Sequence, residues 1–160
     1  MAEDRPDYDA VMSTPVAAVK LGINTTGDKL SNIDFIVSRR GDNLPRNGFI
    51  HEVVSQLRAY FRNPRFTFTL PLSLQGTPFQ KCVWQMLQDI PCGTVLSYGA
   101  VAKNLLTAPR AVGSACCANP LPIVIPCHRV VASDGPGGFS GTSQGQYIHI
   151  KQWLLTHEQG

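Results

Sequence analysis

The sequence has no long apolar run and no stretch that resembles a targeting signal. No apolar segment approaches the ~20 residues that a membrane-spanning helix needs. The acidic start MAEDRPDYDA has nothing in common with a signal peptide. We therefore expect a cytoplasmic protein that does not contact a membrane.

A large excess of charge of either sign is also missing. The formal net charge of the 160 residues is +3. Residues 1–72 hold nine Lys and Arg against eight Asp and Glu, and residues 73–160 hold five against three. Neither part is a basic arm, so the charge alone does not demand a strongly anionic partner.

The cysteines are too few and too scattered for a disulfide framework or a zinc site. There are five, an odd number, at positions 82, 92, 116, 117 and 127. An odd count without a secretion signal fits free thiols in a reducing compartment. No Cys-x-x-Cys pair occurs, and the four histidines make no zinc-type spacing with the cysteines. We expect no metal ion and no cofactor.

The first 72 residues predict a small α+β unit. Residues 1–13 are polar and expected to fray. Runs rich in β-branched residues predict strands at 15–23 and 32–38, with a Gly-Asp turn between them, and the alternation of FTFTLPL predicts an edge strand at 66–72. Apolar residues at helical spacing predict a helix over 48–63. Nothing in this part is a candidate for chemistry.

The remaining residues predict a helical part with clear helix starts. Thr77 and Pro78 mark the N-terminus of one helix, and Ser97 caps a second that begins at Tyr98. A third helix, rich in small residues, covers 110–119. Two short helices joined by a tight turn form the outline of a helix-turn-helix. That outline is shared by many helical pairs in enzymes. An amphipathic helix is expected to close the chain.

The tripeptide Ile-Pro-Cys occurs twice, as IPCG at 90–93 and as IPCH at 125–128. A thiol becomes a strong nucleophile only as a thiolate, which needs a base or a positive neighbour. Cys92 follows a helix C-terminus, where the helix dipole opposes an anion, and it is expected to pack in a turn. Cys127 is followed by His128, which can reach it only if the chain bends at Pro126. The alternative is a buried cysteine beside a core histidine.

Several motifs together resemble the O6-alkylguanine-DNA alkyltransferases, the methylated-DNA–protein-cysteine methyltransferases. They are SY (97–98), RAVGSACCANP (110–120), IPCHRVV (125–131), FSG (139–141) and WLLTHE (153–158). The resemblance covers residues 77–160 in order. It implies an α/β (α+β) protein with a small ribonuclease-H-like domain at 1–72. Residues 73–160 would be a DNA-binding and alkyl-transfer domain with a helix-turn-helix.

The resemblance also implies an activity. Such a protein moves a methyl or alkyl group from O6 of guanine in DNA, and less readily from O4 of thymine, to its own Cys127. Each molecule reacts once, because the thioether is not hydrolysed. His128 would accept the thiol proton through a water, and Glu158 would hold His128. Tyr98 would protonate the leaving guanine.

The remaining implied roles concern the substrate and double-stranded DNA. Asn119 would tie the DNA-binding helix to the IPCHR segment by a hydrogen bond to backbone. The helix would enter the minor groove, Arg110 would fill the gap left by the flipped base, and Ser140 would bond O6. The full set assigned to substrate or DNA is Arg110, Ala111, Gly113, Ser114, Arg129 and Ser140. The protein is expected to act as a monomer.

Other interpretations remain open from the sequence alone. Tyr98 and Arg110 are also ordinary residues for the start of a helix, Glu158 lies near the chain end, and a glycine-rich loop needs small residues such as Ser140 anyway. A module that recognises alkylated bases without reacting is one alternative function. A cysteine hydrolase that uses Cys127, His128 and Glu158 is another.

Overall fold

The computed structural model of this chain describes residues 8–37, 41–46, 48–133 and 146–160. It divides into two compact units, Met1–Leu74 and Gln75–Gly160. The boundary predicted from the sequence, between residues 72 and 73, lies two residues earlier. Within the described ranges, no helix is both long and apolar enough to cross a membrane.

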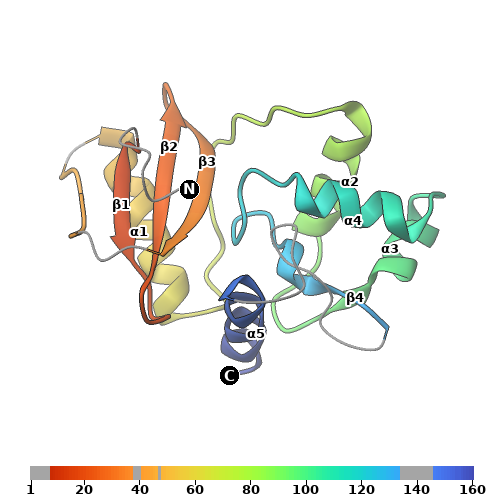
Figure 1. Cartoon of the computed structure of the whole chain (residues 1–160). Coiled ribbons are helices and arrows are strands. Elements are labelled where there is room, and N and C mark those ends of the chain that lie inside the picture. Colours follow the sequence, from red (N-terminus) through yellow and green to blue (C-terminus); the bar gives the residue numbers. More distant parts are fainter. Residues whose placement is uncertain (1–7, 38–40, 47, 134–145) are drawn as a thin grey trace. The chain divides into compact units, whose positions relative to one another are not determined.

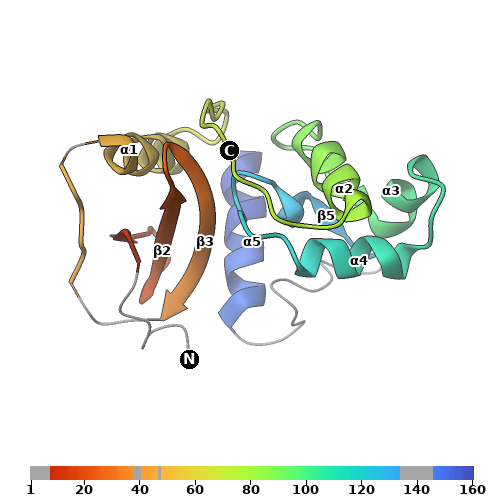
Figure 2. The same cartoon turned by 90° about the horizontal axis from the view of Figure 1, so that it is seen from above.

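The first unit is an antiparallel sheet with one helix packed on it (Figures 1 and 2). Its strands are β1 (Ala10–Ser13), β2 (Val19–Thr26) and β3 (Lys29–Val37), in the order β1-β2-β3. Gly27, at φ 59°, makes the tight turn of the β2–β3 hairpin. Helix α1 (Gly48–Arg62) buries one apolar stripe of its surface. The core residues of α1 are Val53, Val54, Leu57 and Tyr60.

Two predictions for this unit were wrong. The start of the chain is not frayed throughout, because Ala10–Ser13 form β1 and pair with residues 20–23 of β2. Residues 66–72 do not form an edge strand: Leu72 alone makes a bridge, to Leu30. The alternation in FTFTLPL comes instead from packing on α1, where the Phe68 ring lies 5.8 Å from that of Tyr60. Pro71 has no backbone N–H to give to a ladder.

The second unit is built mainly of helices. Its elements are α2 (Pro78–Gln88), β4 (Leu96–Ser97), α3 (Tyr98–Asn104), α4 (Pro109–Cys117), the 3-10 helix η2 (Cys127–Arg129), β5 (Val130–Val131) and α5 (Gln146–Gln159). Thr77 caps α2 in a capping box with Gln80, and Ser97 caps α3 through the Ala100 N–H. Both caps agree with the prediction from the sequence.

The helix α4 is held against α2 and α3 (Figure 1). The indole of Trp84 on α2 donates to the Ala115 carbonyl at 2.8 Å, in a fully buried position. Val112 and Ala115 are the buried residues of α4. The opposite face of α4 is thereby left toward solvent.

A short parallel pair of strands brings distant parts of the sequence together. Leu96 pairs with Val130 and Ser97 with Val131. Tyr98 follows β4 directly, and the CHR segment precedes β5 directly. The pairing therefore places the start of α3 beside the Cys127 turn, although the two are far apart in sequence.

Candidate active site

The chain bends at Pro126, and this bend presents Cys127. Pro126 has φ −80° and ψ 66°, the geometry of an inverse γ-turn, and the Cys127 N–H donates to the Ile125 carbonyl at 2.8 Å. The proline ring fixes φ close to the value this turn needs. Residues 127–129 then form the single turn η2 instead of continuing a strand. The bend that the sequence required for contact between Cys127 and His128 is present.

Asn119 connects the end of α4 to this bend. Its side-chain amide donates to the Ile125 carbonyl at 2.9 Å, and its side-chain oxygen accepts from the Leu121 N–H at 2.9 Å. The hydrogen bond of Asn119 to backbone, predicted from the sequence, is therefore present. Burial raises the pKa of Cys127, and a hydrogen bond from the Asn119 side chain opposes this by favouring the thiolate. One side chain thus holds the loop and acts on the ionisation of the thiol.

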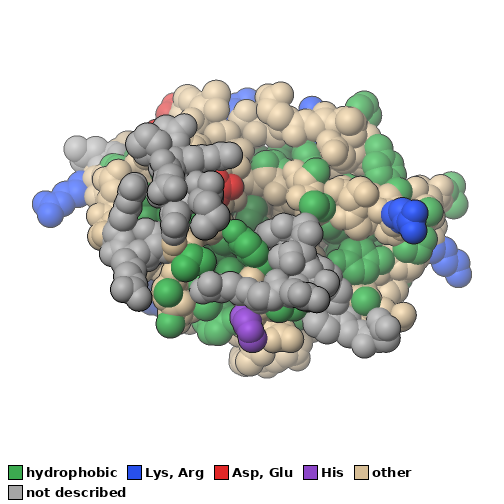
Figure 3. All heavy atoms as spheres, viewed as in Figure 1, with side chains coloured by type: hydrophobic (Ala, Val, Ile, Leu, Met, Phe, Trp, Pro, Cys, Tyr) green, Lys and Arg blue, Asp and Glu red, His purple; other side chains and the backbone are tan. Residues whose placement is uncertain are grey.

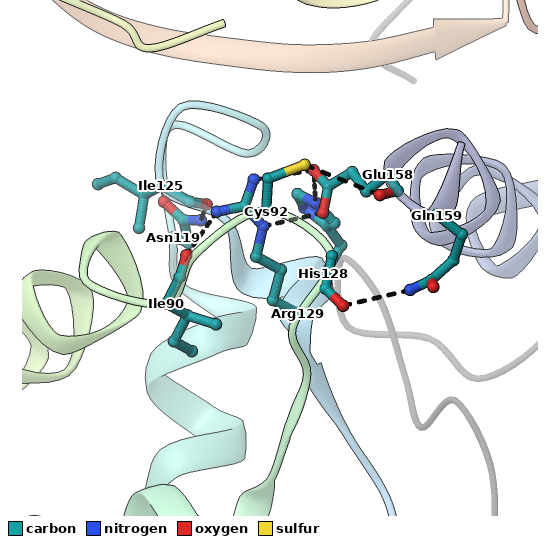
Figure 4. A network of polar contacts seen from close by, with 9 residues as sticks. Ile90, Cys92, Asn119, Ile125, His128, Arg129, Glu158 and Gln159 are labelled. Carbon is teal, nitrogen blue, oxygen red and sulfur yellow. Dashed lines mark hydrogen bonds and ion pairs between the residues drawn. The ribbon is translucent and has the colours of Figure 1, made fainter. Parts of the chain in front are cut away.

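His128, Arg129 and Glu158 form a buried network (Figure 4). The Nε2 atom of His128 lies 2.7 Å from Oε2 of Glu158, and the two side chains are 0% and 2% exposed. The Arg129 guanidinium binds the same carboxylate twice: Nε donates to Oε1 and Nη2 to Oε2, each at 2.9 Å. Its Nη1 donates to the Ile90 carbonyl at 2.6 Å. Glu158, close to the chain end, is held firmly.

This network fixes the tautomer of His128. A carboxylate only accepts hydrogen bonds, so Nε2 carries the proton and Nδ1 is left with its lone pair. Nδ1 is buried and has no hydrogen-bond partner among the residues that the structure describes. Burial, outweighing the opposing effect of Glu158, lowers the pKa of His128. The side chain is a neutral base with one nitrogen open.

Arg129 has contacts other than the expected ones. The resemblance grouped it with the residues that contact substrate or DNA. In the structure its guanidinium is engaged by Glu158 and by the Ile90 carbonyl. Two adjacent residues of the motif, His128 and Arg129, therefore both bind the Glu158 carboxylate of α5.

The other Ile-Pro-Cys copy packs beside this network. The Cys92 thiol lies 3.9 Å from the Glu158 carbonyl, within the turn after α2 (Figure 4). Gly93 has φ +84°, and its carbonyl accepts from the Gln159 side chain at 3.3 Å. A Cβ on Gly93 would lie 3.3 Å from the Glu158 carbonyl, which leaves little room. Cys92 and Gly93 thus help to seat the end of α5.

Tyr98 and Lys151 complete the surroundings of the thiol. Burial, with smaller effects of charge on Cys116 and Cys127, raises the pKa of Tyr98 to about 12, so the phenol keeps its proton. Lys151 is 0% exposed, donates to the Val130 carbonyl at 2.8 Å, and has Nζ 5.7 Å from the centre of the Tyr98 ring. Lys151 was not predicted from the sequence, because a lysine on an amphipathic helix is normally a solvent-facing residue.

Opposing influences act on the ionisation of the Cys127 thiol. Burial raises the pKa of Cys127, whereas the Asn119 hydrogen bond and the charge of Lys151 lower it. Cys116, on α4, also has its pKa raised by burial, to about 12. At rest the site therefore favours the neutral thiol, and ionisation requires a base to take the proton.

The outer face of α4 carries the residues predicted to meet DNA. Arg110 and Ser114 are exposed, Ala111 and Gly113 are partly exposed, and Cys117 lies at the end of the same stripe. A Cβ at Gly113 would meet nothing within 4 Å, so packing inside the protein does not require a glycine there. Figure 3 shows Lys and Arg side chains scattered singly over the viewed face.

Two further predictions concern Ser140 and metals. Ser140 lies outside the described residues. In the described part of the chain, no group of three or more His, Cys, Asp or Glu is arranged to hold a metal ion. All five cysteines lie in the described ranges, and none of them is in a disulfide bond there.

Known proteins resemble this chain over nearly all of its length. Two family models match it: the ribonuclease-like domain of 6-O-methylguanine DNA methyltransferase over residues 11–74, and the DNA-binding domain of the same family over residues 78–160. The methylated-DNA–protein-cysteine methyltransferase of Methanosarcina mazei is 36% identical over 159 residues, which cover 95% of this chain and 97% of that protein. That of Shigella flexneri is 47% identical over 107 residues, 64% of this chain and 60% of that protein.

Solved structures agree with this assignment. The O6-methylguanine methyltransferase of Mycobacterium tuberculosis superposes with a TM-score of 0.75 at 32% identity, covering 93% of this chain and 92% of that one. Mycobacterium tuberculosis OGT in complex with DNA gives 0.76 at 33% identity, covering 93% and 91%. The predicted fold class, a mixed α/β protein with a ribonuclease-like and a DNA-binding part, is confirmed. The chain belongs to the 6-O-methylguanine DNA methyltransferase family.

Proposed function

We propose that this protein repairs DNA by moving an alkyl group from O6 of guanine, and less readily from O4 of thymine, to its own Cys127. The observation that carries the proposal is the open Nδ1 of His128. A buried lone pair next in sequence to a buried thiol, with Nε2 fixed by Glu158, is the arrangement of a base for that thiol.

The transfer is a single displacement. The Cys127 sulfur attacks the alkyl carbon, the S–C bond forms, and the C–O6 bond breaks with its electrons going to guanine. The thiol proton passes to His128 Nδ1 through a water, and Glu158 stabilises the imidazolium that results. No step of this scheme calls for a metal or a cofactor. The product is a neutral thioether, which is not hydrolysed, so each molecule reacts once.

Guanine leaves as an anion unless it receives a proton. Tyr98, whose high pKa keeps it protonated, is the donor that we assign, and Ser140 is assigned to O6. Asn119 and Arg129 are positioning residues in this scheme: the first holds the Cys127 bend and the second holds Glu158. Arg129 is thus reassigned from DNA contact to support of the site.

The α4 face is the proposed DNA surface, in a helix-turn-helix formed with α3. Its small residues allow close approach to the minor groove, and Arg110 takes the place of the flipped nucleotide. A partly exposed glycine with room for a side chain, Gly113, is explained by a partner that comes close from outside. The scattered basic residues predict few phosphate contacts and a weak dependence on salt.

The test is an intact-mass and peptide-mapping assay with a duplex that contains one O6-methylguanine. The wild type, Cys127→Ala and Cys92→Ala are compared, the last being the matched control from the second Ile-Pro-Cys. We expect one methyl group on Cys127 in the wild type and in Cys92→Ala, and none in Cys127→Ala. DNA binding without methylation would indicate a recognition module that does not react. If the protein shows neither DNA binding nor methylation, a cysteine hydrolase becomes the better interpretation.

We further propose that the protein acts as a monomer, and that it works in a reducing compartment, as five cysteines outside disulfide bonds suggest for the second point. Its domains are assigned to residues 1–72 and 73–160. Sedimentation of the protein with and without duplex tests the first point: a dimer in either state would contradict it.

A further inference from the structure

The helix α5 presents two charged residues to the site from one face. Lys151 and Glu158 are seven residues apart, two helical turns, and both are buried. Two turns correspond to ~10 Å along the helix axis. Glu158 serves His128 and Arg129, as described above. Lys151 therefore acts at a different point of the same site.

The contacts of Lys151 define that point. Its ammonium donates to the carbonyl of Val130, the residue that follows η2, and stands over the ring of Tyr98. Burial lowers the pKa of Lys151 to about 8, and the charges of Cys127 and then of Cys116 oppose this by favouring its protonated form. The lysine thus lies beside the Tyr98 ring, and its charge acts on the Cys127 thiol.

A buried thiolate needs such a cation. When Cys127 gives its proton to His128, a negative sulfur is left in a site where burial raises the thiol pKa. The proton then sits on the His128–Glu158–Arg129 network. We propose that the Lys151 ammonium is the electrostatic partner of the Cys127 thiolate, held in the site by its hydrogen bond to the Val130 carbonyl.

Among the residues that the structure describes, the other titratable groups around Cys127 do not supply this charge. On η2, His128 is neutral at rest and Arg129 is bound to Glu158. On α4, Cys116 and Cys117 bring no positive charge, and Tyr98 on α3 is a neutral phenol. The buried residues of α2, which packs on η2, are Val83, Trp84 and Leu87, and none of them titrates.

The proposal has a second consequence at the end of the reaction. Alkyl transfer converts the thiolate to a neutral thioether, so Lys151 loses its anionic partner. Its proton is then held less tightly, close to the Tyr98 ring that has just given a proton to guanine. This use of Lys151 in alkyl transfer rests on the proposed function. Its effect on the ionisation of Cys127 does not.

The experiment therefore measures ionisation without DNA. Iodoacetamide alkylates thiolates, and peptide mapping reports the rate at Cys127 separately from the other cysteines. The rate is followed from pH 6 to 11 for the wild type, Lys151→Met, Lys151→Gln and Lys151→Arg. Lys103→Met, which removes an exposed lysine from α3, is the matched control.

In Lys151→Met and Lys151→Gln, we expect the midpoint of the pH dependence of alkylation at Cys127 to rise by about one pH unit or more. This lowers the alkylation rate at neutral pH about tenfold. Lys151→Arg and Lys103→Met stay within about threefold of the wild type, less than half a pH unit. Equal midpoints in Lys151→Met and the wild type would overturn the proposal. So would a loss in Lys151→Arg as large as in Lys151→Met, because packing would then be the cause.

A reciprocal measurement covers the case in which the neutral variants do not fold. Coupling between two ionisable groups is mutual. The pKa of Lys151 is followed by NMR of the carbon beside Nζ. It must be lower in Cys127→Ala than in the wild type, by the same amount by which Lys151 lowers the pKa of the Cys127 thiol. An unchanged Lys151 pKa would refute the pairing. Methyl uptake from DNA is scored separately, so a failure of the proposed function is distinguishable from a failure of this one.

Discussion

The ion pair between Arg129 and Glu158 gives the sharpest test of how this site is held. The guanidinium makes two hydrogen bonds of 2.9 Å to the carboxylate, which is 2% exposed. Removal of one partner leaves the other charge buried without compensation. Such a change costs about 3 kcal/mol or more, far above the cost for a surface pair.

The perturbation is a double-mutant cycle. Glu158→Gln keeps the size of the side chain and removes its charge, and Arg129→Met removes the guanidinium and keeps much of its length. We expect each single variant to lose about 3 kcal/mol of unfolding free energy, or about 6–12 °C in Tm for a chain of this size. The double variant buries no lone charge, so we expect it to lose at least about 2 kcal/mol less than the sum of the two.

Urea denaturation gives these free energies, and the methyl-uptake assay gives a second readout. Glu158→Gln should slow transfer on the order of a hundredfold or more, because His128 loses the carboxylate that orients and stabilises it. Arg129→Met should slow it less, since the contact of His128 with Glu158 remains. Additive losses in the cycle, within about 0.5 kcal/mol, would refute the reasoning that this pair holds the site.

Four further outcomes are expected. Gly113→Gln should stabilise α4 by up to about 1 kcal/mol, since a side chain has room there, yet weaken duplex binding in a gel-shift assay; unchanged binding would exclude this face. Asn119→Ala should lower the unfolding free energy measured by urea denaturation by about 2 kcal/mol and raise the pKa of Cys127. Asn119→Asp keeps the hydrogen bond from the Leu121 N–H. Equal pKa values of Cys127 in Asn119→Ala and the wild type would contradict the assigned contact. Because the pKa of His128 is lowered on folding, the unfolded chain binds more protons below about pH 6.5, so stability should fall as the pH drops through that region, and it should fall less in His128→Asn. The methylated protein should melt at a lower temperature than the unreacted one, because the added group crowds a thiol that is 6% exposed; an identical melting curve would count against this.

The sequence by itself determined the features that depend on neighbours within a few residues. Thr77 and Ser97 start α2 and α3, because a capping side chain satisfies N–H groups two or three positions along the chain. Pro126 bends the chain before Cys127, because its ring sets its own φ. The ordered motifs around Cys127 indicated the family, which the comparisons confirm.

Only the tertiary structure decided which distant side chains meet. The contacts of Arg129 with Glu158, of Lys151 with Val130, and of Cys92 with the Glu158 carbonyl span 21 to 66 positions of the chain. No local signal distinguishes an arginine that binds a buried carboxylate from one that faces DNA, or a buried lysine from a solvated one. The same holds in the first unit, where the alternation of FTFTLPL fits an edge strand and a packed extended segment equally well. Partner choice is set by packing, and packing is a property of the folded chain.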